Sequence, residues 1–271
     1  MPLLGVGLSG LASFLFGPPA PCKLAAWGPS IQLLSHRGGS LEHIENTLPA
    51  FRRSASLGIP LILEMDICMT KDGHCVVFHD DDLGRLCGVP GKAIGDYDLA
   101  DLPLLLVPDV LKGTVRDDDI EARRIPLFDE VLREFPSFPM QVDVKRGTES
   151  MILKVGNTIR HHRREHLTVW GSFASTQSAL CYKHFGTNIP LLFSYQRMLT
   201  SWFLSWFGLT RAIRYHESAI IMPNLRWLMR PRWFEALNRA GVAVIVWGAL
   251  EDVGKGPGGG INTVEGFERV K

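Results

Sequence analysis

Two acidic residues lie close together in an apolar run of the chain. Glu64 and Asp66 belong to the stretch LEMDICMTKDGHCVVFHD, residues 63–80, which ends in the pair His79-Asp80. Side chains two residues apart in a strand point to the same face, so the carboxylates of Glu64 and Asp66 would stand side by side. Neighbouring carboxylates repel each other unless water, protons or a cation neutralise them. The stretch therefore indicates either an edge strand with one solvated face or a metal site.

The elements that position these groups follow from an alternating pattern. Apolar or β-branched runs that predict strands occur at residues 31–36, 61–67, 140–145, 167–173, 190–195, 219–224 and 242–250. Helical segments are predicted between most of them, for example over residues 45–58, with Asn46 or Thr47 as the N-cap, and over residues 147–162. Strands separated by helices are typical of parallel sheets, which indicates a (β/α) barrel or a doubly wound sheet.

Two segments depart from this alternation. Residues 76–80 follow the second strand too closely for a crossover, so they are predicted to return as a hairpin across Asp72-Gly73. Residues 82–125 are rich in Asp, Gly and Pro and have weak periodicity, which predicts an insertion. The main domain is therefore expected over residues 31–250, with residues 82–125 inserted into it.

Composition excludes several classes of protein. The chain has 271 residues, of which 46% are hydrophobic and 21% are charged, so it has the composition of a globular protein rather than a disordered one. Its formal net charge of +1 gives no general case for a nucleic-acid partner. The five cysteines form no C-x-x-C pair and are odd in number, which favours free thiols over a disulfide framework.

The two ends of the chain differ from the rest. Residues 1–22 contain no charged side chain, yet their apolar run is shorter than the roughly 20 residues of a spanning helix. Residues 1–30 are therefore expected to form either a membrane anchor or a disordered tail. Residues 251–271 contain GKGPGGG, which opposes strand formation. We expect this Gly-rich tail not to supply a proper last strand, which would leave the first strand weakly protected and the protein less stable than a complete barrel.

Ionisable groups stand at or near the ends of several predicted strands: His36, Glu64, Asp66, Asp143 and Lys145. In parallel α/β folds the carboxyl ends of the strands share one face, and that face holds the active site. The hairpin brings His79 back beside Glu64 and Asp66, and Trp247 lies late in the last strand. These groups are predicted to converge on one site.

The sequence resembles the glycerophosphodiester phosphodiesterases. The similarity lies in SHRGGSLEHIENTLPAF (35–51), in residues 63–80 and in QVDVK (141–145), and it extends from residue 33 to about residue 250. The resemblance implies an α/β fold, a TIM (β/α)8 barrel of the phosphodiesterase type, here with a small insertion and an incomplete or atypical last strand. It also implies one divalent cation, Mg²⁺ or Ca²⁺.

The same resemblance implies roles for individual residues. His36 and His79 would perform acid–base catalysis, with His36 as the acid and His79 as the base. The metal ligands would be Glu64, Asp66 and Asp143, where most relatives have Glu in place of Asp143. The substrate or phosphate contacts would come from Arg37, Lys145, Glu45 and Trp247. Attack by the 2-hydroxyl of glycerol would give a cyclic phosphate.

These residue types suit phosphodiester hydrolysis. Attack on a phosphodiester adds negative charge to the phosphoryl oxygens, which a hard cation and the side chains of Arg37 and Lys145 can neutralise. Imidazole suits proton transfer because its pKa lies near neutral pH. Residues alone do not divide the acid and base roles between His36 and His79.

Residues 164–171 and 188–197 are more closely similar to the membrane-associated lysophospholipase D-type members of the family. This similarity implies hydrolysis of lysoglycerophospholipids to the head-group alcohol and lysophosphatidic acid. It also implies association with a membrane, at the endoplasmic reticulum or around the nucleus, with the cytoplasm as the other location. Protein partners are not indicated.

The segment MLTSWFLSWFGL, residues 198–209, bears on the lipid question. It has no charged residue, and Trp202, Phe203, Trp206 and Phe207 occur at helical spacing. Such a helix can lie in a membrane interface, or it can pack against the core of a barrel.

Three other functions stay open at this level. The chain could be a soluble glycerophosphodiesterase that acts on glycerophosphocholine-like substrates. It could also be a catalytically impaired, truncated form that only binds lipid, because a missing eighth strand leaves the barrel unclosed. The third alternative is a membrane-bound interaction protein that uses only the aromatic helix. In that case the histidines and carboxylates described above would have no role.

Overall fold

The computed structural model describes residues 24, 27, 31, 33–40, 42–145 and 147–248. The expectation of an anchor or tail concerns residues 1–30, of which only residues 24 and 27 are described, and the Gly-rich tail, residues 251–271, lies outside the described part of the chain. The same holds for the expected effect of that tail on barrel closure.

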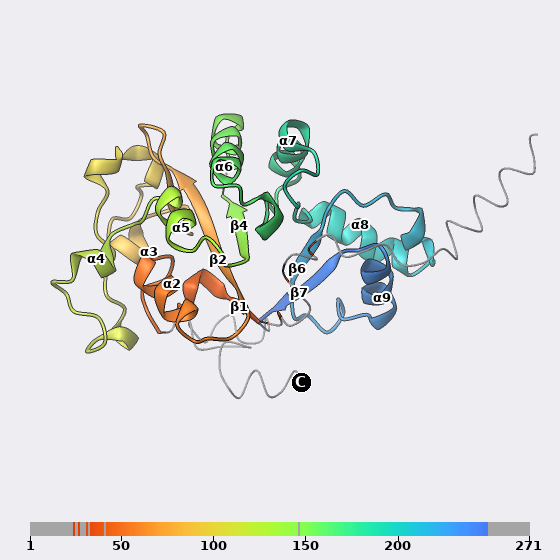
Figure 1. Cartoon of the computed structure of the whole chain (residues 1–271), viewed down its shortest axis with the longest axis horizontal. Coiled ribbons are helices and arrows are strands. Elements are labelled where there is room, and N and C mark those ends of the chain that lie inside the picture. Colours follow the sequence, from red (N-terminus) through yellow and green to blue (C-terminus); the bar gives the residue numbers. More distant parts are fainter. Residues whose placement is uncertain are drawn as a thin grey trace, which may run out of the picture.

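The strands form two groups that together make the wall of a barrel; Figure 1 shows β1, β2 and β4 in one group and β6 and β7 in the other. Their bounds are β1 Leu33–Ser35, β2 Leu61–Met69, β3 Cys75–Val77, β4 Met140–Val144, β5 Thr168–Gly171, β6 Ala219–Pro223 and β7 Ala243–Trp247. Strands β1, β2, β4 and β5 pair in this order and are parallel, and β6 pairs in parallel with β7. Parallel bridges from Leu191 to Trp170 and from Leu192 to Ala219 join the two groups. The predicted α/β barrel is confirmed, although the run at 190–195 contributes only these bridges.

The wall is open between β1 and β7 in the described part of the chain. There, β1 pairs only with β2, and β7 pairs only with β6. The wall at this seam is therefore incomplete within the described ranges.

Strand β2 is longer than its apolar run predicts. It continues to Met69 because β3 pairs with its second half in the predicted antiparallel hairpin, with Ile67 opposite Val77. Glu64 and Asp66 consequently lie in the middle of β2 rather than near its end. They are 5% and 2% exposed, so the alternative of an edge strand with a solvated face is wrong.

The longer helices lie around the strands, and two short helices within residues 82–125 lie at one end of the molecule (Figure 1). Their bounds are α2 Leu48–Ala55, α3 Gly84–Cys87, α4 Ile120–Arg123, α5 Phe128–Glu134, α6 Glu149–His161, α7 Ser175–Phe185, α8 Tyr195–Ser205 and α9 Pro231–Arg239. Thr47 is the N-cap of α2, where its hydroxyl accepts a hydrogen bond from the amide of Ala50 at 3.4 Å. No helix within the described ranges has both the length and the apolar character needed to cross a membrane.

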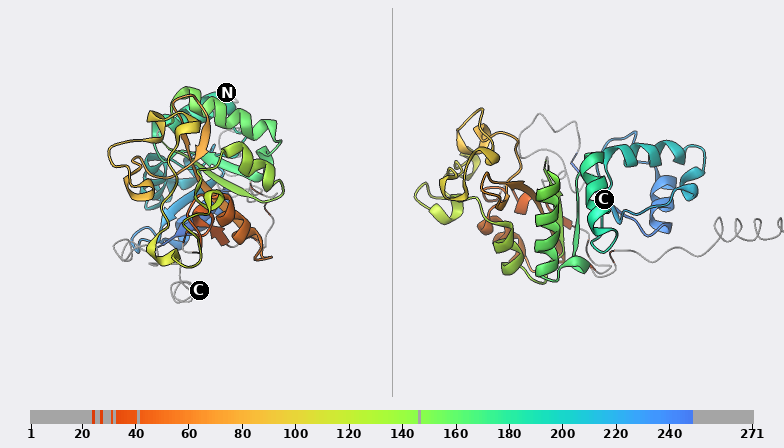
Figure 2. Two further views of the ribbon diagram at one scale, coloured as in Figure 1. Left: turned by 90° about the vertical axis from the view of Figure 1, so that its left-hand side faces the viewer. Right: turned by 90° about the horizontal axis from the view of Figure 1, so that it is seen from above.

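The alternation along β2 divides the core into two parts. Leu61, Leu63, Met65 and Ile67 pack outward in one cluster with the helices, whereas Ile62 belongs to a cluster that includes Val169 and Ile221. Residues 82–125 form short helices with a separate cluster of buried side chains, which includes Val76 and Phe78 of the hairpin. Two views show that α3 and α4 lie at one end of the molecule and α8 and α9 at the other (Figures 1 and 2).

Candidate functional site

The strands surround a cavity of about 920 Å³. It is lined by all but one of the predicted site residues: His36, Arg37, Glu64, Asp66, His79, Asp143, Lys145 and Trp247. The remaining one, Glu45, contacts Arg37 through an ion pair of 2.8 Å. The structure therefore brings the whole predicted set into one place.

Three carboxylates face the cavity from two adjacent strands. Asp66 of β2 is directly opposite Asp143 of β4 in the parallel register, and Glu64 lies two residues earlier on the same face of β2. Burial raises the pKa of Glu64 well above its usual value, and the negative charge of Asp66 adds to this shift. Burial also raises the pKa of Asp143. This local excess of negative charge is unfavourable, and a cation would relieve it.

Asp66 is the carboxylate that stays ionised most easily. Burial opposes its ionisation, but Lys145, His79 and Arg37 outweigh burial and hold its pKa below the usual value. The ammonium of Lys145 lies 3.1 Å from Oδ1 of Asp66 and also pairs with Asp143. Burial alone would lower the pKa of Lys145, but the carboxylates of Asp66 and Asp143 outweigh burial and raise it. Lys145 is therefore a permanent cation at the base of the site.

A tight turn after β1 places His36 and Arg37. Arg37 has φ of +52°, a left-handed conformation that is uncommon for a residue with a side chain. In this conformation its amide donates a 2.6 Å hydrogen bond to Oε2 of Glu64. The His36 ring stacks against Trp247 at a centroid distance of 6.3 Å. Burial and the neighbouring charge of Arg37 lower the pKa of His36 to about 4, so its ring is neutral at pH 7.

His79 is oriented by a network that crosses the site. Its Nδ1 is 2.7 Å from Oδ1 of Asp80, and Oδ2 of Asp80 accepts a 2.7 Å hydrogen bond from Nε of Arg85. Arg85 also donates hydrogen bonds of 2.8 and 2.9 Å to the two oxygens of Glu45. Since Glu45 also pairs with Arg37, the network joins the two segments that carry the histidines. With Nδ1 held by Asp80, Nε2 is the His79 atom left to exchange a proton with a substrate.

Sequence reasoning missed three residues of the site. Asp80 and Arg85 form the network above, and Asn46 donates a 3.0 Å hydrogen bond from Nδ2 to Oδ2 of Asp66. Asn46 was expected only as an N-cap, although its position in the Glu-Asn-Thr motif was a usable signal. Its Oδ1 is buried without a hydrogen-bond partner in the described structure, beside the carboxylates.

Two sets of side chains compete as metal ligands. Glu45, His79 and Asp80 each offer an atom within 4.8 Å of the others. However, the guanidinium of Arg85 already pairs with the carboxylates of Glu45 and Asp80, and it would repel a cation bound there. Glu64, Asp66 and Asp143 are three buried carboxylates that face two cationic groups, the ammonium of Lys145 and the more distant guanidinium of Arg37. They therefore keep an excess of negative charge, and the uncompensated Oδ1 of Asn46 lies nearby. Oxygen donors suit a hard divalent cation, so this second set fits such an ion better.

Aromatic side chains line the side of the cavity near α8. The rings of Phe173 and Tyr195 are stacked with centroids 4.9 Å apart, and both line the cavity together with Met229. The lining of the cavity therefore combines the charged groups with aromatic and apolar side chains.

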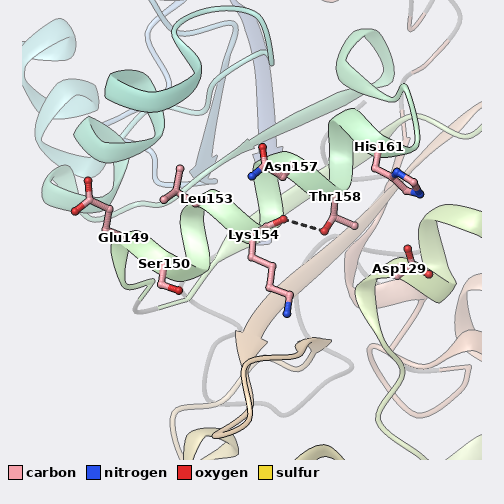
Figure 3. Close-up of a pocket in the computed structure, with 8 residues that line it drawn as sticks. All are labelled: Asp129, Glu149, Ser150, Leu153, Lys154, Asn157, Thr158 and His161. Carbon is pink, nitrogen blue, oxygen red and sulfur yellow. Dashed lines mark hydrogen bonds between the residues drawn. The ribbon is translucent and has the colours of Figure 1, made fainter.

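A second hollow lies on the outer surface of α6 (Figure 3). Its walls include Glu149, Lys154 and His161, and the hydroxyl of Thr158 donates to the carbonyl of Lys154 at 2.8 Å within the helix. None of the predicted site residues lines this hollow, and its polar groups are ordinary features of a solvated helix face.

Comparison with known proteins agrees with this geometry. Residues 36–265 match the glycerophosphoryl diester phosphodiesterase family. The chain is 35% identical over 239 residues to human "Lysophospholipase D GDPD1", covering 79% of this chain and 75% of that protein. It is 30% identical over 245 residues to human "Lysophospholipase D GDPD3", covering 80% and 75%.

Solved structures share the fold. A phosphodiesterase of Oleispira antarctica, in complex with the product sn-glycerol-3-phosphate, superposes with a TM-score of 0.64 at 21% identity, covering 82% of this chain and 86% of that one. A glycerophosphodiester phosphodiesterase of Agrobacterium tumefaciens gives a TM-score of 0.62 at 20% identity, covering 80% and 86%. The resemblance drawn from the sequence motifs is thus confirmed, and the chain belongs to the glycerophosphoryl diester phosphodiesterase family of enzymes.

Proposed function

We propose that this phosphodiesterase is a lysophospholipase D, which releases the head-group alcohol and lysophosphatidic acid from lysoglycerophospholipids. The observation that carries the proposal is the mixed lining of the cavity, which combines histidines and carboxylates with the aromatic and apolar side chains of Phe173, Tyr195 and Met229. A glycerophosphodiester without an acyl chain has no apolar group to contact such a wall. The names of the two human relatives support the same substrate class.

The reaction needs a free hydroxyl beside the phosphodiester. In the first step the 2-hydroxyl of the glycerol attacks phosphorus, the bond to the head-group oxygen breaks, and a cyclic phosphate forms. In the second step water opens the ring and gives lysophosphatidic acid. A lysophospholipid acylated at position 1 carries this free hydroxyl, whereas a diacyl phospholipid does not.

The two histidines, His36 and His79, carry out the proton transfers. One ring accepts the proton of the attacking hydroxyl, the other protonates the leaving alcohol, and the roles reverse in the second step. The neutral state of His36 at pH 7 favours this ring as the base of the first step. This differs from the assignment that the family resemblance implies, in which His36 starts as the acid. Lys145 and Arg37 stabilise the charge that develops on the phosphoryl oxygens.

Enzymes of this family generally depend on a divalent metal. In our proposal Glu64, Asp66 and Asp143 would hold one such ion, Mg²⁺ or Ca²⁺. When bound, the ion would supply positive charge that neutralises a phosphoryl oxygen of the substrate.

We further propose that the enzyme works at a membrane, at the endoplasmic reticulum or around the nucleus. The support is the similarity to membrane-associated family members and the exposed aromatic residues of α8. Imaging of the tagged full chain against membrane markers tests the location, and an even cytoplasmic signal would contradict it.

A choline-release assay tests the substrate. The purified chain with Mg²⁺ or Ca²⁺ should hydrolyse lysophosphatidylcholine with a higher kcat/KM than glycerophosphocholine, because only the former contacts the apolar wall. A higher kcat/KM for glycerophosphocholine would instead identify a soluble glycerophosphodiesterase. Binding of lysolipid without turnover of either compound would identify an impaired, lipid-binding form.

The network around Arg85 provides a test of how the histidines are positioned. Arg85→Met should lower kcat by roughly 10- to 100-fold with little change in KM, because Asp80 and Glu45 lose the cation that joins them. Arg85→Lys should recover only part of the rate, since an ammonium cannot make the same forked contacts. Arg116→Met is the matched control, because Arg116 pairs only locally with Asp118 and its side chain is 81% exposed. A loss of thermal stability without a change in kcat would assign Arg85 a structural role only.

A further inference from the structure

One side of α8 presents apolar side chains to solvent. From the start of α8 into the turn that follows it, every fourth residue is apolar and at least 45% exposed: Tyr195, Leu199, Phe203 and Phe207. We call these four residues the α8 stripe. The opposite side of the helix is buried at Met198 and Ser201, so the helix packs against the barrel and still exposes an apolar side. The expected packing against the barrel is therefore confirmed for one side of the helix, and the expected membrane interface stays a prediction for the other.

The end of the stripe is enriched in tryptophan. Trp206 and Trp227 are 59% and 51% exposed, and the half-buried Trp202 contacts both rings, with centroid distances of 5.7 and 5.2 Å. The guanidinium of Arg230 lies 3.6 Å above the ring of Trp206. We call Trp206, Phe207 and Trp227 the aromatic tip. Tryptophan beside arginine is typical of surfaces that meet lipid head groups.

The charge of this part of the molecule is strongly asymmetric. Residues 195–248 contain seven arginines, no lysine and two glutamates, whereas the whole chain has a net charge of +1. Of the two glutamates, Glu217 is buried and pairs with Arg197 at 2.7 Å. Arg214, Arg226 and Arg232 are exposed. This part of the chain is thus cationic, with Arg230 in contact with the aromatic tip, and it complements an anionic surface.

The stripe also begins at the substrate cavity. Tyr195 is the first residue of α8, lines the cavity and stacks on Phe173. From there the stripe runs along α8 toward the aromatic tip, at the end of the molecule opposite to α3 and α4 (Figures 1 and 2). An apolar chain could therefore stay in contact with apolar side chains from the tip to the cavity.

Other occupants fit this surface less well. A symmetric contact between two copies would place the arginines of one copy against those of the other. Residues 1–22 of the chain have no charged side chain, so they cannot neutralise the arginines. A bilayer that contains anionic lipids satisfies both the apolar side chains and the charge.

We propose that the α8 stripe and the aromatic tip form a docking surface for a phospholipid bilayer that contains anionic lipids. Docking in this orientation lets a lysolipid pass from the bilayer along the stripe into the cavity, a step that rests on the proposed function.

Vesicle binding tests the docking surface directly. Full-length protein is sedimented with phosphatidylcholine vesicles that contain or lack phosphatidylserine. Phe203→Ser/Phe207→Ser should weaken binding by about 10-fold or more, because two exposed phenylalanines no longer enter the interface. The matched control is Val110→Ser/Ile120→Ser, which removes two apolar side chains that are 61% and 65% exposed in the segment predicted as an insertion. This control should bind as the unaltered chain does.

A second double variant tests whether the arginines contribute to vesicle binding. Arg226→Gln/Arg232→Gln should weaken binding to vesicles with phosphatidylserine about 10-fold and leave binding to pure phosphatidylcholine unchanged. Unchanged binding of both double variants, or no binding of the full chain to either vesicle, would overturn the proposal. Loss of a dimer in the Phe203→Ser/Phe207→Ser variant, with vesicle binding intact, would identify a second copy as the occupant and overturn it as well.

An activity assay separates the docking proposal from the proposed function. Phe203→Ser/Phe207→Ser should hydrolyse lysophosphatidylcholine embedded in vesicles at least about 10-fold more slowly and hydrolyse glycerophosphocholine in solution at an unchanged rate. Equal losses on both substrates would contradict docking as the cause. If the unaltered chain hydrolyses no lysolipid at all, the proposed function fails, and vesicle sedimentation still decides whether the surface docks.

Discussion

Replacing His36 or His79 by glutamine should lower kcat by roughly 10²- to 10⁴-fold, the usual contribution of a general acid or base. Glutamine keeps a polar side chain in the cavity but cannot take up and release a proton near neutral pH. Metal affinity should change little in either variant, because the three carboxylates, not the imidazoles, are the proposed ligands. Steady-state kinetics and calorimetric metal titration measure the two effects separately.

The histidine variants have a natural control in His161→Gln. His161 lies in the hollow on the outside of α6 (Figure 3), and its replacement should leave kcat unchanged. If either His36→Gln or His79→Gln retains a rate near that of the unaltered enzyme, that histidine is structural and the proposed proton transfers are wrong.

The second large effect concerns the metal. The double variant Glu64→Gln/Asp66→Asn should abolish binding of Mg²⁺ or Ca²⁺ in isothermal titration, together with metal-dependent turnover. Amides are weaker ligands than carboxylates for a hard cation, and the variant removes two of the three proposed charges. Unchanged affinity would refute this ligand assignment.

A companion variant decides between the two candidate ligand sets. Asp80→Asn alters the group formed by Glu45, His79 and Asp80 and leaves Glu64 and Asp66 intact. It should bind metal nearly as well as the unaltered chain. Abolished binding in Asp80→Asn, with normal binding in the Glu64→Gln/Asp66→Asn variant, would move the metal to the other group.

The same substitutions report on stability. The pKa of Glu64 is raised above its unfolded value, so its charge costs stability once the pH rises through and above that unfolded value. Glu64→Gln should therefore raise the Tm of the metal-free protein at pH 7. Added metal should reverse the order, because the ion then stabilises only the chain that keeps its carboxylates.

Local patterns predicted much of the fold. The alternation along β2 separated Leu63 and Met65, which pack outward, from Glu64 and Asp66, which face the cavity. The hairpin followed from the turn at Asp72-Gly73, and the start of α2 followed from Thr47. Each of these features depends on residues within a few positions of one another, which is why the sequence alone could indicate them.

Long-range contacts were harder to predict. Arg85 donates hydrogen bonds to Glu45, 40 positions earlier in the chain, and to Asp80, five positions earlier. Only the folded chain brings all three groups together. The length of β2 was underestimated because its pairing with β3 extends the strand beyond the apolar run. The two-sided character of α8 was likewise not decided by spacing, since Trp202 is half-buried and its neighbour Phe203 is exposed.

The catalytic groups and the aromatic wall of the cavity come from different parts of the chain. Every group proposed for proton transfer, metal binding or charge neutralisation lies between His36 and Lys145. The aromatic wall and the α8 stripe come from residues 173–229, and Trp247, through its stacking on His36, links this later part to the catalytic groups. Evolution can therefore alter the aromatic wall through the second half of the gene while the first half keeps the reaction. The same division makes residues 173–229 the region for a library that seeks new acyl or head-group preferences.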